Sequence, residues 1–153
     1  MNYNDFPILS DDAYDFLRDK YKNEMTFDRE TSINKVCYYL NECVGSCKSL
    51  KSKLNLKLRQ AVEFADAQIN KTLSSLNETF DIRVSSNSIK EFNLFTFLKY
   101  LTNSIEMLIN LGYKEEKEYY KKVYNICLNS LIESVKKIVE ALETSNIGLY
   151  KFM

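Results

Sequence analysis

Apolar residues recur every three or four positions along most of this chain, the spacing that places side chains on one face of an α-helix. Such stripes predict helices over residues 10–23, 28–50, 58–80, 89–111 and 114–144. The second stripe consists of Ile33, Val36, Cys37, Leu40, Cys43, Val44, Cys47 and Leu50. The last consists of Tyr120, Tyr124, Cys127, Leu131, Val135, Ile138 and Leu142. The pattern therefore predicts an all-α protein.

The polar stretch between residues 48 and 55 decides whether residues 28–80 form two helices or one. A continuous helix of ~50 residues would be ~75 Å long, whereas a compact domain of this length has a radius of gyration near ~15 Å. Leu54, Leu56 and Leu58 are also two positions apart, so they cannot share a helical face. We predict a break near Ser52. The alternative is one long helix that extends from the bundle or is shared with a second subunit.

Local signals suggest where the later helices begin and end. Ser88-Ile-Lys-Glu91 fits the capping-box pattern, which predicts that a helix starts there. Gly112 is typical of the residue that closes a helix in the left-handed conformation. The last helix is then predicted from Lys114 to Thr144.

Short connections between long helices make neighbouring helices antiparallel. We therefore expect one domain, residues 1–153, that is an antiparallel up-down-up-down four-helix bundle. A short additional N-terminal helix, residues 10–23, is expected beside it. Its inner face would carry Ala13, Phe16, Leu17 and Tyr21. Residues 1–9 are an extended lead-in and residues 145–153 a tail.

Composition agrees with this fold and narrows the function. The chain has only 1 Pro and 3 Gly, residues that sheet proteins need at turns and long helices avoid. Its 21 basic and 21 acidic residues give no net charge, whereas nucleic-acid binders normally carry a basic excess. No apolar run approaches the ~20 residues that span a bilayer, and no signal peptide is visible. We expect a cytoplasmic protein that binds no nucleic acid.

The chain contains no histidine. This excludes the Glu-x-x-His ligands of di-iron bundles and the usual Ser-His-Asp and Cys-His nucleophile systems. Carboxylates, Lys or Tyr could still catalyse a reaction, but no spacing supports a specific one. We predict that the protein is not an enzyme and has no cofactor.

The cysteines are the remaining candidates for metal binding. Cys43 and Cys47 are neighbours on one helix surface, and Cys127 in the last helix could approach them, so three thiolates with a carboxylate could bind zinc. However, no Cys-x-x-Cys pair is present, and all four cysteines fall on or beside apolar stripes. Free cysteine behaves as a small buried hydrophobe. We therefore predict a packing role and no metal site.

Aromatic residues supply the candidate binding surface. Tyrosines crowd the start of the last helix, and Tyr38 and Tyr39 lie together on the second. Tyrosine combines a large apolar body with a polar tip, which suits it to interfaces. Asp66 lies near an inner stripe among small residues, where a carboxylate could face a pocket. The candidate interface or pocket residues are Tyr113, Tyr120, Tyr124, Phe95, Phe97 and Asp66.

These observations leave two functional hypotheses. The first is a non-enzymatic interaction or regulatory module that presents a helical face to another protein or to its own copy. The alternative is a helical bundle that binds a small molecule or lipid in an aromatic-lined pocket.

Overall fold

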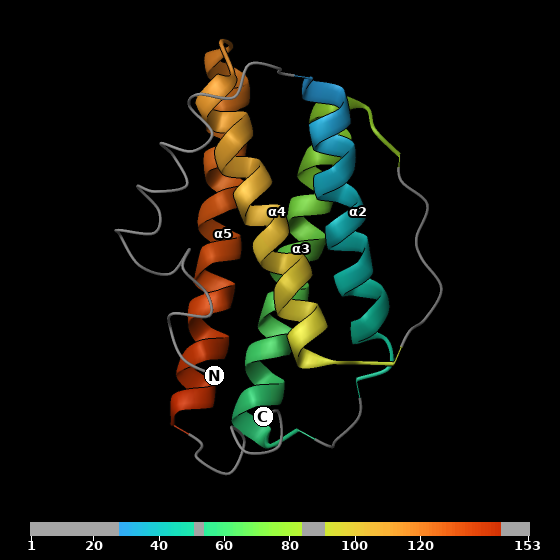
Figure 1. Ribbon diagram of the computed structural model, residues 1–153, viewed down its shortest axis with the longest axis vertical. Helices are drawn as coiled ribbons and strands as arrows, with labels where there is room; N and C mark the ends of the chain where they lie inside the picture. Colours follow the sequence, from blue (N-terminus) through green and yellow to red (C-terminus); the bar gives the residue numbers. More distant parts are fainter. Residues whose placement is uncertain (1–27, 51–53, 84–90, 145–153) are drawn as a thin grey trace.

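The computed structural model describes residues 28–50, 54–83 and 91–144. Within these ranges the chain forms four α-helices and no strand, which confirms the all-α prediction (Figure 1). They are α2 (Arg29–Cys47), α3 (Leu56–Phe80), α4 (Leu94–Lys114) and α5 (Glu118–Glu143). The predicted lead-in, N-terminal helix and tail lie outside the described residues.

Three of the four helices begin at an Asp or Asn whose side chain accepts a hydrogen bond from the backbone N–H three residues later. Asp28 caps α2 at Thr31, Asn55 caps α3 at Leu58 and Asn93 caps α4 at Thr96. Each cap satisfies an N–H that has no partner within the helix. Of the two starts that the sequence allowed for this helix, near Asp28 or near Thr31, the structure shows the first. The predicted break is also confirmed, because α2 ends at Cys47 and α3 starts anew after Asn55.

Two predicted helix ends are wrong. The pattern at Ser88–Glu91 does not start α4, because Glu91 and Phe92 precede the helix and Asn93 provides the cap. Gly112 does not end α4, which continues to Lys114 without a positive φ at the glycine. The last helix consequently begins at Glu118 rather than Lys114.

The four helices form a ring in which α2 packs against α3 and α4, and α5 packs against the same two helices. Arg29 at the start of α2 binds Glu115 just beyond α4, while Cys43 near the end of α2 bonds to Phe97 near the start of α4. Phe80 at the end of α3 likewise stacks on Tyr124 near the start of α5. Both of these pairs are therefore antiparallel.

The predicted up-down-up-down order is wrong at one step. Figure 1 shows α2 and α5 running in one direction and α3 and α4 in the other. The end of α3 and the start of α4 therefore lie at opposite ends of the bundle, so a short turn cannot join them. Four-helix bundles use such long crossover connections as well as short ones. The rule that short connections make neighbouring helices antiparallel therefore does not apply between α3 and α4.

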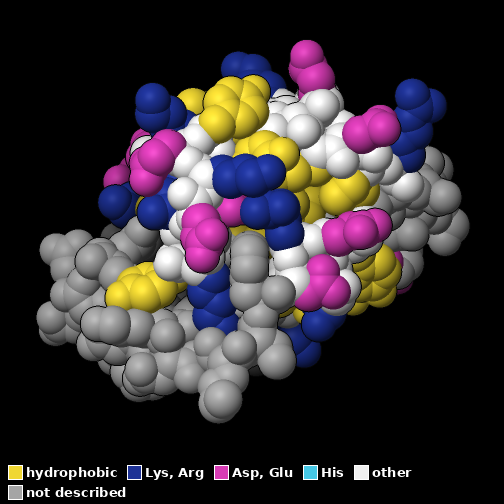
Figure 2. All heavy atoms as spheres, turned by 90° about the horizontal axis from the view of Figure 1, so that it is seen from above, with side chains coloured by type: hydrophobic (Ala, Val, Ile, Leu, Met, Phe, Trp, Pro, Cys, Tyr) yellow, Lys and Arg dark blue, Asp and Glu magenta, His cyan; other side chains and the backbone are white. Residues whose placement is uncertain are grey.

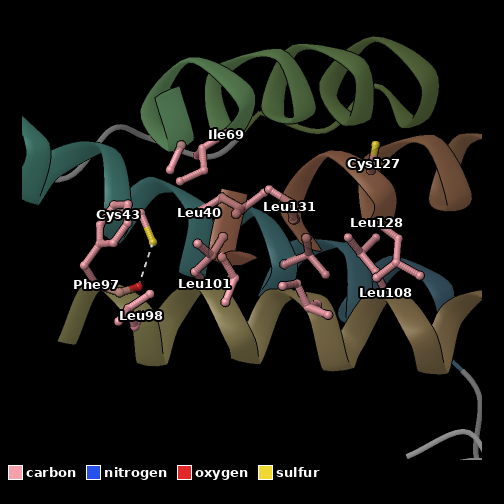
Figure 3. Packing of buried hydrophobic residues seen from close by; sticks show 14 of the residues in the cluster. Leu40, Cys43, Ile69, Phe97, Leu98, Leu101, Leu108, Cys127, Leu128 and Leu131 are labelled. Atoms are coloured by element: carbon pink, nitrogen blue, oxygen red, sulfur yellow. Dashed lines mark hydrogen bonds between the residues drawn. The ribbon is translucent and has the colours of Figure 1, made fainter. Parts of the chain in front are cut away.

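The core is built from the predicted stripes. Leucines and other apolar side chains of all four helices meet along the bundle axis, with Leu40, Leu101 and Leu131 completely buried (Figure 3). The thiol of Cys43 donates to the carbonyl oxygen of Phe97 at 3.5 Å within this core. Phe95, one of the candidate interface or pocket residues, lies outside this core and is 45% exposed.

Gly112 gives a direct test of the corrected α4 boundary. Gly112→Ala is expected to raise the free energy of unfolding by about 0.5–1 kcal/mol, because alanine is the better residue inside a helix. An added Cβ would meet nothing within 4 Å. Urea unfolding of the two proteins measures the difference. A marked destabilisation would instead indicate a left-handed glycine and a helix that ends there.

Candidate functional site

The structure does not bring the six candidate residues together. Tyr124 and Phe97 are core residues, 0% and 1% exposed. Tyr120 is half-buried beside Phe80, with ring centroids 4.7 Å apart. Phe95 and Tyr113 are exposed, at opposite ends of α4. These residues consequently do not form a single pocket or surface, and Tyr124 and Phe97 are unavailable to a partner.

A partly buried ion pair, in which Arg29 is 33% exposed, joins the start of α2 to the connection between α4 and α5. Arg29 donates from Nε and Nη2 to the two carboxylate oxygens of Glu115, each at 2.7 Å. The hydroxyl of Tyr124 donates to Oε1 at 2.7 Å. The backbone N–H groups of Glu116 and Lys117 donate to Oε2 at 3.1 and 3.2 Å. The Glu115 side chain is 0% exposed and accepts all five hydrogen bonds.

These contacts stabilise the charged carboxylate. The hydrogen bonds from Arg29 lower the pKa of Glu115 from 4.5 to about 2, against the opposing effect of burial. Burial, and then the bond to Glu115, raises the pKa of Tyr124. Because both carboxylate oxygens are fully occupied, neither is available as a general base. Figure 2 looks onto this end of the bundle and shows acidic and basic side chains interspersed around it.

The lowered pKa of Glu115 predicts a specific pH dependence. In the folded state its pKa is about 2 and the ordinary value is 4.5, so its contribution is fully present above pH 4.5. That contribution is lost as the pH falls towards 2. Wild-type protein is thus expected to be more stable than Glu115→Gln at pH 7, with the gap closing between pH 4.5 and about 2. Denaturant unfolding of both proteins across this pH range measures the difference in stability. A difference that does not change with pH would contradict the prediction.

The cysteine thiols are poorly suited to metal or redox chemistry. Burial raises the pKa of Cys37 and of Cys127 to about 11. It also raises the pKa values of Cys43 and Cys47 above their ordinary range. In the part of the chain that the structure describes, no three Cys, Asp or Glu side chains are grouped so that they could hold a metal ion. The geometry therefore favours the packing role for the cysteines.

Asp66 lies on α3 facing Cys47 of α2, whose thiol hydrogen-bonds to its carboxylate. Burial raises the pKa of Asp66, while the bond from Cys47 and the charge of Lys48 oppose the rise. Its Oδ1 atom has no hydrogen-bond partner among the described residues. Asp66 therefore lies at the margin of the bundle. Its burial there disfavours the charged form of the carboxylate.

Asp66→Asn is expected to stabilise the protein at pH 7, by up to about 1 kcal/mol, because an amide carries no charge to desolvate. The folded-state pKa lies above the ordinary 3.8, so wild-type protein loses stability relative to the variant as the pH rises through 3.8. The difference in stability between Asp66→Asn and wild-type protein should therefore be absent at pH 3. Glu63→Gln, at an exposed position on the same helix, is the matched control and should change little. A destabilised Asp66→Asn protein at pH 7 would contradict this reading.

Two hollows lie beside tyrosines at the start of α5. One of about 810 Å³ lies between α3 and α5, beside Tyr119 and Val123, but Asn70, Lys71, Ser74, Ser75 and Glu78 form much of its wall. Another, of about 470 Å³, lies beside Tyr120 and Phe80 at the start of α2. Both are open to solvent, unlike the enclosed apolar cavities in which helical bundles hold lipids.

A second aromatic group was only partly visible in the sequence. Tyr38 and Tyr39 of α2 meet Tyr100 of α4 at the surface between these two helices. The rings of Tyr39 and Tyr100 stack with centroids 6.0 Å apart. Tyr38 packs edge-on against both, at 5.7 and 6.5 Å, and is 45% exposed. We call these three residues the tyrosine patch. Only the adjacency of Tyr38 and Tyr39 pointed to it in the sequence.

No protein-family model, curated protein or solved structure matches this chain. Among the helices that the structure describes, none combines the length and the apolar character needed to cross a membrane. The function must therefore be argued from the site itself.

Proposed function

We propose that this chain is a non-enzymatic protein-interaction module that binds a partner protein through the tyrosine patch. The observation that carries this proposal is the mutual packing of three tyrosine rings from two helices, which leaves Tyr38 nearly half exposed. Tyrosine is among the residues that contribute most to binding energy at protein interfaces. A group of three tyrosines, of which Tyr38 is exposed and Tyr39 and Tyr100 are half-buried, is a natural anchor for a partner.

The way the patch is held favours recognition. Each ring contacts the other two, and the helices beneath them are fixed by the core. Side chains that are already ordered lose less conformational entropy when a partner binds, which improves affinity. The hydroxyl groups can also form hydrogen bonds at the rim of an interface.

The other chemical groups support a non-enzymatic role. Glu115 is occupied by five hydrogen bonds, and the cysteine thiols have raised pKa values. All four cysteines are unpaired, which suits the reducing cytoplasm that we propose for this protein. No feature of the open hollows favours the alternative of a small-molecule or lipid-binding bundle.

Affinity capture from extracts of the source organism tests the proposal, with Tyr38→Ala compared against Tyr119→Ala. Tyr119 is 66% exposed on α5, so it matches Tyr38 in residue type and accessibility but lies outside the patch. Wild type and Tyr119→Ala are expected to recover the same partner. Tyr38→Ala should recover it at least ~10-fold less well, as for an interface hot spot.

Thermal unfolding of each variant shows that the loss is not a folding defect. Recovery of the same partner by Tyr38→Ala would overturn the proposal. So would an equal loss with Tyr119→Ala, or the absence of any partner recovered by wild-type protein in stoichiometric amounts.

A further inference from the structure

One side of α4 faces away from the core and yet becomes buried along its length. Leu101 is fully buried in the core, and a helix turns by about 100° per residue. Lys99, Asn103, Glu106 and Asn110 are therefore all within about 40° of the direction opposite Leu101. Lys99 is exposed, Asn103 and Glu106 are half-buried, and Asn110 is only 7% exposed.

The described helices are not placed to explain this burial, because the residues that α4 packs against them, such as Leu101 and Leu108, lie on its opposite side. α4 packs against α2 and α5, which lie on its two inner flanks. Tyr113 lies about 60° to one side of Asn110 and is 37% exposed. Whatever covers Asn110 is therefore narrow. We infer that a single segment of chain lies along the second half of α4, and we propose that it is residues 10–23.

The position of the first described residues favours this segment. Arg29 is bound to Glu115, one residue beyond α4, so the chain reaches α2 beside the end of α4 nearest Asn110. Residues 24–27 can span up to ~14 Å when extended. A helix over residues 10–23 would be ~21 Å long, and Asn103 and Asn110 are only ~10 Å apart along α4. The segment is therefore long enough and begins at the correct end.

The chemistry of the segment also fits. Ala13, Phe16, Leu17 and Tyr21 share one helical face that requires cover. The Oδ1 atom of Asn110 is buried and has no donor among the described residues. Tyr21, near the end of the segment closest to Asn110, has a hydroxyl that can donate to it. Docking would thus bury an apolar stripe and satisfy an unpaired amide.

Thiol labelling of Asn110→Cys in the full-length chain tests the inference, with each cysteine followed by peptide mass spectrometry. The thiol introduced at position 110 should react slowly, whereas a Lys99→Cys protein, with its thiol at an exposed position of the same side, should react quickly. Adding Phe16→Ser is expected to raise the rate at position 110 at least tenfold. Adding Asp15→Ser, on the opposite face of the segment, should leave it unchanged.

Three results would overturn the inference. The first is fast labelling at position 110 of the Asn110→Cys protein with no further substitution. The second is a slow rate that Phe16→Ser does not change. The third is a slow rate that rises instead with Leu149→Ser, which would assign the cover to the tail, or on dilution, which would assign it to a second copy of the chain. Unfolding curves distinguish a local release of the segment from global unfolding.

Discussion

Arg29→Ala is expected to lower the free energy of unfolding by about 1.5–3 kcal/mol, because Arg29, itself 33% exposed, donates two hydrogen bonds to the charged carboxylate of Glu115. The reason is that Glu115 would keep its charge at a site where its side chain is 0% exposed. The variant would also detach the start of α2 from the connection between α4 and α5. A melting temperature lower by ~3–12 °C should accompany the loss.

Two variants separate this effect from the loss of an arginine as such. Arg59 also pairs with a glutamate, Glu63, but at 3.7 Å and with both side chains partly exposed, so Arg59→Ala should cost no more than about 1 kcal/mol. Adding Glu115→Gln to Arg29→Ala should restore part of the stability, because no buried charge then remains. Equal losses of unfolding free energy for Arg29→Ala and Arg59→Ala would mean that the pair of Arg29 and Glu115 does not stabilise the fold.

Deleting Ser85–Ser88 is expected to prevent the native bundle from forming. Twelve peptide units connect Asp81 to Asn93, which can reach at most ~43 Å. α4 is 21 residues and so ~31 Å long, and α3 and α4 lie diagonally across the ring. With eight units left, the connection reaches only ~29 Å. Circular dichroism and urea unfolding should show lost cooperativity.

An insertion is the matched control for this deletion. Four Gly or Ser residues added between Ser86 and Asn87 should be tolerated, because the entropy of closing a loop grows only slowly with its length. In an up-down-up-down bundle the deletion would leave a loop that still makes a short turn. Native stability of the shortened protein would therefore contradict the parallel arrangement of α3 and α4.

The helices themselves could be predicted from the sequence because the evidence for them is local. The stripe from Leu58 to Leu76 depends only on residues within one helix, and it is buried as expected. The ends of the helices were harder to predict, because several local signals compete. Ser88 and Asn93 are both acceptable caps, and the sequence alone does not show that Asn93 is used.

The features that could not be predicted depend on contacts between distant parts of the chain. Arg29 and Glu115 are 86 positions apart, and no motif connects them. Tyr100 joins Tyr38 and Tyr39 only because α4 packs antiparallel against α2. The candidate list included Tyr124 and Phe97 because aromatic residues in helices look alike in sequence, whether they serve the core or the surface.

We propose that this helical scaffold recognises a partner protein at the surface between α2 and α4, where the tyrosine patch lies. Hydrogen exchange of the full-length protein, with and without its captured partner, tests this claim most directly. We predict that binding slows exchange in peptides of α2 that contain Tyr38 and Tyr39 and in peptides of α4 that contain Tyr100. Slowed exchange confined to α3 and α5, or to the end of the bundle around Arg29 and Glu115, would contradict it.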